Sequence, residues 1–315
     1  MVAVSAVACS ADSPDSPEAA GSSGGDATEA RTVTVGANPI SDLAPLWVGD
    51  QAGVFEDHGI TLDIQTGGGG AALLPSVVSG QYQFAFANPT TLFVAEQQGL
   101  DLRVVSNLAS STGEPGSDGS AVLVRDDSPI QSPADLAGAT VAINTFNSIG
   151  TTVIRESVRQ AGADPDAIEF VEIGFGDMMA ALEAGNVDAA WEVEPFISSS
   201  VANGYRAVAW PYVDVDPELP IALAFTSAQQ AEEDPQLIED FAAALAESIE
   251  YSNENPDEVR SVIPTFTALT AEQVENVFYP RWTTDINRDA VSELGQLMVQ
   301  DGVLPAEPDL DSLLP

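Results

Sequence analysis

Short β-like runs alternate with helical stretches along most of this 315-residue chain, and this alternation limits the possible fold more than any other feature. It is typical of sheets built from strand–helix–strand units. The first expected strands span residues 32–37, 60–66, 83–87 and 102–108. The helices expected between them span residues 44–56, 70–79 and 90–98. Together these elements predict one α/β lobe.

A second series of elements follows the acidic, Gly-rich loop at residues 110–119. Its expected strands span residues 120–125, 139–144, 168–173, 188–191 and 205–209. Its expected helices lie near residues 133–136, 149–162, 177–184 and 194–203, and Ser132 begins a capping box before the first of them. This series predicts a second α/β lobe.

The chain beyond Pro220 is expected to contain one strand, Ile221–Phe225, followed by helices only. The chain would then cross between the lobes twice, near residues 120–126 and 218–226. The expected first lobe comprises residues 31–120 plus 221–315, and the expected second lobe comprises residues 121–220. Two tandem domains without a shared hinge are the alternative arrangement.

The N-terminal segment contains the only cysteine of the chain, Cys9, after a run of small and apolar residues. This resembles the end of a bacterial lipoprotein signal peptide, although the basic segment is missing and Ala6 stands where Leu is usual. We expect residues 1–9 to be a signal remnant and residues 10–30 a disordered tether. A lipid on Cys9 would then be the only anchor to the outer face of the cell membrane. An incidental cysteine is the alternative.

The charge of the chain is strongly negative, because 49 acidic residues face nine basic residues, all of them Arg, for a net charge of −40. Such a surface repels nucleic acids and anionic lipids, so we expect neither as a partner. Adaptation to high salt explains an acidity that is spread along the chain. A surface that attracts a cationic ligand is the alternative.

Four segments resemble, in the same order, the periplasmic proteins that bind alkanesulfonates, taurine, nitrate and the pyrimidine precursor of thiamine. They are Ala44–Val48 with Gly53–Ile60, Ser79–Ala85 with Gln83 where Asp is usual, Asp135–Ala142 without the usual lysines, and Gly185–Trp191 with Glu194-Pro195. The resemblance covers roughly residues 32–300. It implies a type II periplasmic-binding fold with a ligand cleft between two lobes, two crossing strands as hinge and a helical C-terminal part. It also implies a monomer that delivers a small molecule to the permease of an ABC transporter.

Polar turns that follow the strands are expected to line the cleft, because ligands of open α/β sheets bind beyond the carboxyl ends of the strands. The expected first-lobe contacts are Asn38, Trp47, Gly69, Gly70, Asn88, Thr90 and Thr91. The expected second-lobe contacts are Thr145, Asn147, Ser148, Gly150, Thr151, Trp191, Glu192 and Glu194. The alternatives are a flexible turn for the glycines, a solvated loop for residues 144–152, and simple helix capping for Asn88, Thr90 and Glu194.

These turns contain no Arg, whereas they contain two Glu and are accompanied by Trp residues and Phe146. The ligand expected from this composition is a neutral or weakly basic heteroaromatic, such as a thiamine pyrimidine precursor. A sulfonate or carboxylate held by backbone N–H groups is the alternative ligand. A ligand sensor for a membrane signalling partner is the alternative function.

Several kinds of catalysis conflict with the composition. The nearest enzymatic relatives of this fold use pyridoxal phosphate, which needs a Lys, and the chain has none. His58 is the sole histidine and lies at an expected helix end, where it favourably meets the helix dipole. Paired carboxylates stay possible among so many acids. We expect no enzyme activity, no cofactor and no metal.

Overall fold

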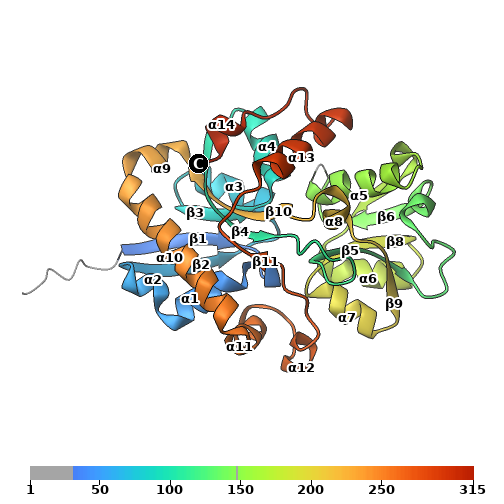
Figure 1. Ribbon diagram of the computed structural model, residues 1–315, viewed down its shortest axis with the longest axis horizontal. Helices are drawn as coiled ribbons and strands as arrows, with labels where there is room; N and C mark the ends of the chain where they lie inside the picture. Colours follow the sequence, from blue (N-terminus) through green and yellow to red (C-terminus); the bar gives the residue numbers. More distant parts are fainter. Residues whose placement is uncertain (1–30, 147) are drawn as a thin grey trace, which may run out of the picture.

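The computed structural model describes residues 31–146 and 148–315, which form two β-sheets with helices packed around them (Figure 1). The expected signal remnant, the tether, Cys9 and Asn147 lie outside the described residues. We call each sheet with its helices a lobe, and Figure 1 shows the two lobes side by side.

The sheet of the first lobe has six strands in the order β11-β4-β10-β3-β1-β2. Their bounds are β1 (Arg31–Ala37), β2 (Ile60–Thr66), β3 (Phe84–Ala87), β4 (Leu102–Ser110), β10 (Pro220–Ser227) and β11 (Arg281–Trp282). β1 is parallel to both β2 and β3, whereas β10 runs antiparallel to β3 and β4. β10 therefore occupies the middle of this sheet although it follows the whole second lobe in the chain.

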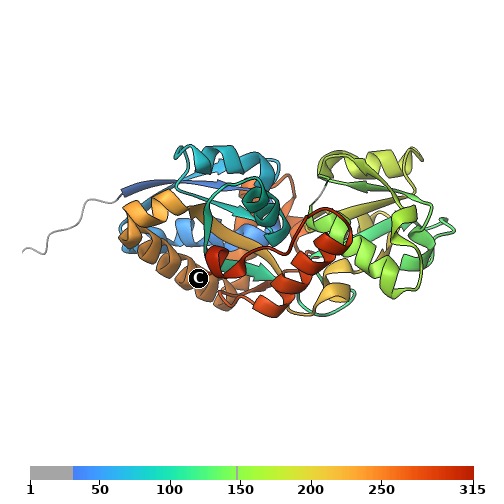
Figure 2. The same ribbon diagram turned by 90° about the horizontal axis from the view of Figure 1, so that it is seen from above.

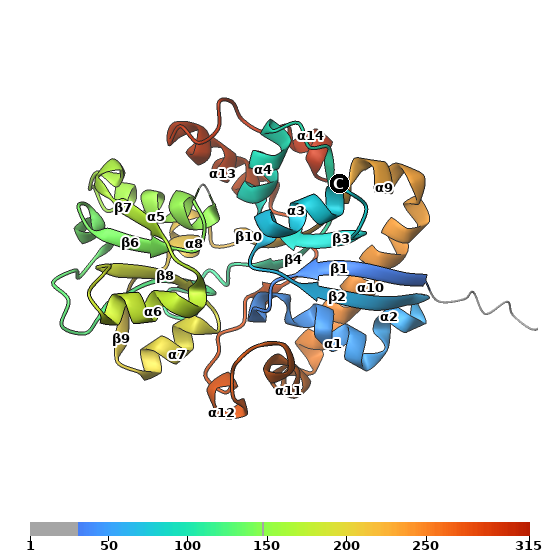
Figure 3. The ribbon, with the colours of Figure 1, turned by 180° about the vertical axis from the view of Figure 1, so that it is seen from behind.

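The sheet of the second lobe has five strands in the order β7-β6-β8-β5-β9, all contributed by one contiguous stretch of chain (Figure 3). Their bounds are β5 (Ser120–Arg125), β6 (Thr140–Ile143), β7 (Glu169–Glu172), β8 (Ala189–Val193) and β9 (Tyr205–Ala209). β6 is parallel to β7 and β8, and β5 is antiparallel to β8 and β9. The predicted strands are thus present in both lobes.

The helices of the first lobe pack on its sheet through large apolar side chains. They are α1 (Ala44–Ala52), α2 (Val54–Asp57), α3 (Gly70–Val78), α4 (Pro89–Gln97), α9 (Ala228–Glu233), α10 (Pro235–Glu254) and α11 (Pro256–Phe266). Phe84 of β3 stacks on Phe241 of α10, with ring centroids 3.9 Å apart. The single helix expected at residues 44–56 is divided, because Gly53 has a φ of 81° and ends α1 in the left-handed region.

The helices of the second lobe cover both faces of its sheet. They are α5 (Ile149–Gln160), α6 (Phe175–Glu183), α7 (Phe196–Ala202) and α8 (Pro211–Val215), with short 3-10 turns at Pro133–Leu136 and Pro165–Ala167. Side chains alternate along β8: Trp191 packs in the same core as α5, whereas Ala190 packs against Met178 and Leu182 of α6. α6 begins two residues before the expected start at Asp177, which lies in its first turn. α8 is one short turn that no periodicity predicted.

The C-terminal part is helical except for β11, which pairs with β4 and corrects the expectation that only helices follow residue 225. Its last helices are α12 (Ala271–Val274), α13 (Arg288–Gln300) and α14 (Leu310–Leu313). Among the described helices, none combines the length and the hydropathy needed to cross a bilayer.

The chain crosses from the first sheet to the second through residues 111–119 and returns through residues 210–219, next to the expected crossing strands. The C-terminal part adds two further links between the lobes, and Figure 2 shows α13, in dark red, in front of the junction. Arg159 of α5 forms an ion pair with Asp301, directly after α13, at 2.5 Å. On the other side, the Ser198 hydroxyl of α7 lies 2.6 Å from the carbonyl oxygen of Asn276. The domain boundaries stated above remain our proposal.

Candidate ligand-binding site

A small cavity with a volume of about 60 Å³ lies between the two lobes, at the carboxyl ends of their parallel strands. The lining from the first lobe comprises Asn38, Ile40, Asp42, Leu43, Gly70, Phe86, Ala87, Asn88, Ile221 and Ala222. The lining from the second lobe and the returning segment comprises Asn144, Ile149, Phe175, Trp191, Val193 and Tyr212. Because both lobes contribute, a molecule held here would contact both at once.

Asn88 caps α4 and presents its amide group to the cavity. Its Oδ1 accepts hydrogen bonds from the Thr91 N–H at 3.0 Å and from the hydroxyls of Thr90 and Thr91 at 2.7 and 3.1 Å. Since a backbone N–H can only donate, the oxygen must face the helix and the Asn88 NH2 group faces elsewhere. Asn88 therefore caps α4, which was the alternative role predicted for it, and its side chain also leaves two N–H donors for a bound molecule.

Asp42 lies in the 3-10 turn Ser41–Leu43 and lines the cavity, and only 4% of it is exposed. Burial raises the pKa of its carboxyl well above the ordinary value, and nearby Asp118 and Glu194 raise it further. Its Oδ1 is buried without a hydrogen-bond partner. The Oδ1 atoms of Asn38 and Asn144 are also buried without partners. The cavity thus holds several polar groups whose hydrogen-bonding capacity is unused by the protein.

Aromatic side chains form the wall of the cavity in the second lobe. The Trp191 ring is tilted against Phe175 with centroids 5.7 Å apart and meets the Tyr212 ring edge-on at 6.2 Å. Its Nε1 donates a 2.7 Å hydrogen bond to the Ser120 hydroxyl. A Cβ on Gly150 would lie 2.7 Å from the Trp191 ring, so Gly150 lets α5 pack directly on that ring. These contacts hold Trp191 in one orientation.

Three helices start at the cavity: α3 at Gly70, α4 after Asn88 and α5 at Ile149. The N-cap residues of α3 and α5 make no side-chain capping hydrogen bond. Free N–H groups and positive dipole ends at these positions favour an electron-rich atom of a ligand. None of the residues that line this cavity in the described chain is an Arg, Lys or His.

Several residues expected from the sequence as ligand contacts lie elsewhere. Trp47 stacks on Phe266 of α11 with centroids 4.0 Å apart and does not line the cavity. The hydroxyls of Thr145, Ser148 and Thr151 donate to neighbouring backbone carbonyls within their own turn. Of the expected contacts, Asn38, Gly70, Asn88 and Trp191 line the cavity; Trp47, Gly69, Thr90, Thr91, Thr145, Ser148, Gly150, Thr151, Glu192 and Glu194 do not.

Glu192 and Glu194 are fully buried, but neither lines the cavity. Glu192 shares the face of β8 that carries Ala190, and burial raises its pKa to about 9, with neither carboxyl oxygen hydrogen-bonded. Burial also raises the pKa of Glu194 to about 7, against the lowering effect of hydrogen bonds from Ser198 and the Phe278 N–H. Glu194 therefore joins α7 to the C-terminal segment.

The sequence analysis missed several lining residues because their local sequence patterns gave a weak signal or none. Asp42 directly follows the turn residues considered after the first strand, so an acidic side chain at a strand end was the available signal. Tyr212 lies on α8, whose single turn gives no periodic pattern. Phe175 starts α6 two residues before the expected boundary. The apolar lining residues look like ordinary core positions in the sequence.

Comparison with known proteins gives relatives that match most of the chain. The formylaminopyrimidine-binding protein of Halalkalibacterium halodurans is 25% identical over 225 residues, which are 70% of this chain and 65% of that protein. The chain thus spans slightly less than two thirds of that relative. The taurine-binding periplasmic protein of Escherichia coli is 22% identical over 232 residues, which are 73% of this chain and 70% of the relative.

Solved structures share the fold at lower identity. The periplasmic aliphatic sulphonate binding protein of Escherichia coli superposes with a TM-score of 0.75 at 18% identity, covering 89% of this chain and 96% of that chain. A desulfurization enzyme superposes with a TM-score of 0.66 at 18% identity, covering 89% and 95%. The predicted two-lobed periplasmic-binding fold is confirmed, and the same fold occurs in an enzyme.

A family model supports the resemblance that the four sequence motifs indicated. The model described as NMT1/THI5 like matches residues 40–259, which include the whole sheet of the second lobe, four of the six strands of the first and every lining residue except Asn38. With more than half of its length matched, the chain belongs to the NMT1/THI5-like family.

Proposed function

We propose that this protein is a solute-binding protein that captures a neutral or weakly basic heteroaromatic molecule, such as a thiamine pyrimidine precursor, for an ABC importer. The observation that carries the proposal is the cavity between the lobes, where aromatic rings meet unpaired carboxyl and amide groups and no described lining residue is cationic. A planar heteroaromatic ring matches both parts of this lining. Its faces contact the aromatic wall, and its nitrogen atoms pair with the polar groups.

The named relatives support binding as the activity. One binds a formylaminopyrimidine and the other taurine, by their names. A fold with a closable cleft suits a carrier, and binding would stabilise the arrangement in which both lobes contact the solute. We propose that the protein binds rather than converts its ligand, although a desulfurization enzyme has the same fold.

Taurine or another sulfonate is the second candidate ligand, because three helix N-termini meet at the cavity. Such N-termini bind anionic oxygens without a cationic side chain. Against this candidate stand the buried carboxyl of Asp42 and the aromatic rings of Phe86, Phe175 and Trp191. The sulfonate group offers acceptors only, so a sulfonate without an amino group gives the Asp42 carboxyl no hydrogen-bond donor.

The cellular setting is a further part of the proposal. We infer that the protein acts outside the cytoplasm as a monomer, is held to the membrane by a lipid on Cys9, and passes its ligand to a permease. A ligand sensor for a membrane signalling partner would use the same cavity. Uptake of radiolabelled ligand by cells that carry or lack the gene separates the two, because a sensor alone leaves uptake unchanged.

Thermal unfolding with candidate ligands tests the ligand class. We expect 4-amino-5-hydroxymethyl-2-methylpyrimidine to raise the melting temperature by several degrees at saturating concentration, because a ligand at a hundred times its Kd stabilises the native state by about 2.7 kcal/mol. Taurine and ethanesulfonate at the same concentration should leave the melting temperature unchanged. A shift with the sulfonates alone would refute the heteroaromatic ligand and favour the second candidate.

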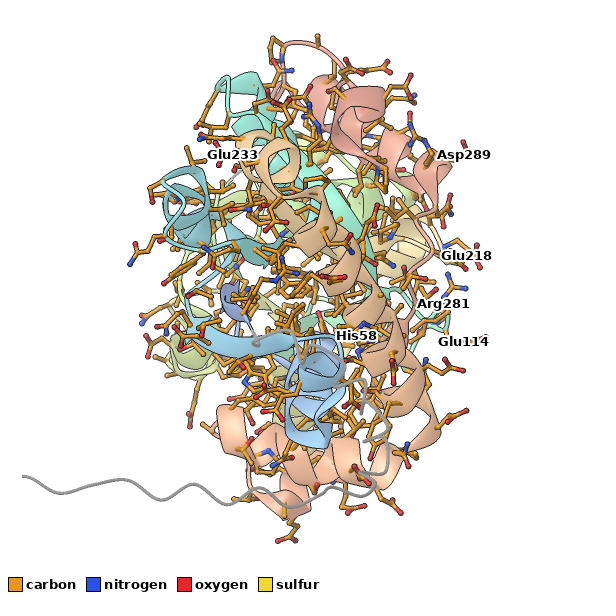
Figure 4. All side chains as sticks on the ribbon, turned by 90° about the vertical axis from the view of Figure 1, so that its left-hand side faces the viewer. His58, Glu114, Glu218, Glu233, Arg281 and Asp289 are labelled. Carbon is orange, nitrogen blue, oxygen red and sulfur yellow. The ribbon has the colours of Figure 1, made fainter. Side chains whose placement is uncertain are left out.

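The acidic surface leads to a separate prediction about salt. Eight of the nine Arg form ion pairs with acidic side chains, namely Arg31, Arg103, Arg125, Arg155, Arg159, Arg260, Arg281 and Arg288. Most acids in residues 31–315 therefore form no ion pair with an Arg. Figure 4 labels acids from separate segments, of which Glu218 pairs with Arg281, whereas Glu114, Glu233 and Asp289 form no ion pair with the described residues.

Because a net charge of −40 makes the folded surface repel itself, we expect the melting temperature to rise between low salt and about 1 M NaCl, where the Debye length is about 3 Å. KCl should give the same rise, since the effect is one of screening. A melting temperature that stays constant, or falls because the Arg ion pairs dominate, would refute the proposed adaptation to salt.

A further inference from the structure

The carboxyl group of Asp42 is presented to the cavity with no partner of its own. Neither of its oxygens takes part in a hydrogen bond or an ion pair with the described residues, and Oδ1 is fully shielded from solvent. Its backbone, in contrast, is anchored, because the Trp282 Nε1 of β11 donates a 3.0 Å hydrogen bond to the Asp42 carbonyl oxygen. A buried polar group held in place and left unpaired is unusual in a folded protein and points to a ligand.

Two acidic groups near Asp42 make its charged form unfavourable, namely Asp118 from the first crossing segment and Glu194 directly after β8. Tyr212 on α8 also lies near Asp42, and burial and Asp42 raise the pKa of its hydroxyl. The Asp118 Oδ1 is occupied by hydrogen bonds from Ser111 and Thr112. Since burial and two acidic neighbours raise the pKa of Asp42, its carboxyl is uncharged below that raised value and ionises only above it.

We propose that Asp42 recognises the ligand as a neutral carboxylic acid, pairing with a ligand edge on which a ring nitrogen lies beside an exocyclic amino group, as in a 4-aminopyrimidine. This inference rests on the proposed function and specifies its ligand class. The O–H of the Asp42 side-chain carboxyl donates to the ring nitrogen, and the C=O oxygen of the same carboxyl accepts from the amino group. A cavity that uses both hydrogen bonds rejects molecules that supply only acceptors.

Titration calorimetry with a matched pair of probes measures this recognition. The probes are 4-amino-5-hydroxymethyl-2-methylpyrimidine and its analogue without the amino group. At neutral pH we expect the amino probe to bind roughly ten- to a hundredfold more tightly, because the analogue leaves the buried carbonyl oxygen unpaired. The preference should decline as the pH rises through the raised pKa of Asp42, since an ionised carboxylate no longer donates.

Two substitutions at Asp42 separate a neutral acid from a charged one. Asp42→Asn keeps one donor and one acceptor, so it should retain the preference to within about threefold and lose its pH dependence. Asp42→Leu removes both groups and should bind the two probes equally. Asp118→Asn is the matched control, because it removes an acid from the same cluster that does not line the cavity. It should keep the amino preference, but the decline of the preference should move to lower pH, since Asp118 helps to raise the pKa of Asp42. Circular dichroism melts verify that each variant is folded.

Each outcome has a separate meaning. Loss of binding in folded Asp42→Asn would show that a carboxylate holds a cationic ligand and would overturn the inference. An unchanged amino preference in Asp42→Leu would overturn it as well, while leaving the proposed function intact. If the wild-type protein binds neither pyrimidine but binds taurine, the proposed ligand class fails first, and the role of Asp42 fails with it.

Discussion

Replacing Trp191 with alanine is expected to abolish ligand binding and to lower the free energy of unfolding by about 3–5 kcal/mol. The Trp191 side chain is only 2% exposed, lines the cavity and contacts the rings of Phe175 and Tyr212. Its removal leaves a cavity in the second-lobe core and an unpaired Ser120 hydroxyl. Urea unfolding gives the loss of stability, and titration with 4-amino-5-hydroxymethyl-2-methylpyrimidine gives the loss of binding.

Trp47→Ala provides the matched control, because it removes the same side chain from a position outside the cavity. Trp47 is half-buried and stacks on Phe266, so its loss should destabilise the first lobe to a smaller extent and leave the affinity unchanged. Equal losses of affinity in both variants would show that binding responds to general destabilisation. Full affinity in Trp191→Ala would place the ligand away from this wall.

Replacing Glu192 with glutamine is expected to stabilise the protein at alkaline pH by several kcal/mol. The pKa of this carboxyl rises from an ordinary 4.5 to about 9 on folding, because it is buried without a hydrogen-bond partner. The folded state therefore holds a proton that the unfolded state releases. The wild-type stability should fall between pH 4.5 and about 9, by at most ~1.4 kcal/mol per pH unit from this group, and then level off.

Glutamine is neutral throughout this range, so the difference in stability between Glu192→Gln and the wild type should grow with pH. Urea unfolding at several pH values measures it. Glu169→Gln, which changes an exposed acid on β7 in the same sheet, should alter the stability by less than about 0.5 kcal/mol. A difference that does not change with pH would contradict a neutral Glu192.

The same variant examines the expectation that Glu192 contacts the ligand. Alternation along β8 places Trp191 and Glu192 on opposite faces of the sheet, with only Trp191 lining the cavity. Glu192→Gln should therefore bind the ligand as the wild type does. A loss of affinity would show that Glu192 reaches the ligand.

The sequence predicted the architecture well because each strand and helix has a local pattern. Turns after strands placed Asn38, Gly70 and Asn88 in the expected cleft, and these three residues line the cavity, since their position at the carboxyl ends of strands follows from topology. What the pattern could not supply is the partner of each side chain. Trp47 and Trp191 look equally suited to stack on a ligand, yet Trp47 stacks on Phe266, which lies far along the chain.

The sequence analysis missed Asp42 and Tyr212 for the same reason, namely that local patterns do not show contacts between distant positions of the chain. Asp42 and Tyr212 come together only because the returning segment brings α8 back beside the first turn of the chain. No local periodicity reports a contact between positions so distant in sequence. The faces of β8 were equally ambiguous, because Trp191 and Glu192 are adjacent and the strand is buried on both sides.

The position of β10 also determines the order in which the molecule can be assembled. Because β10 separates β3 from β4, the N-terminal sheet lacks its middle strand until the ribosome has passed residue 227. Residues 120–209, in contrast, contain every strand of their own sheet. Pairing of β10 with β4 closes a long loop, which is entropically costly and slow. The lobe encoded second is therefore the one able to fold first, and the lobe encoded first is completed around it.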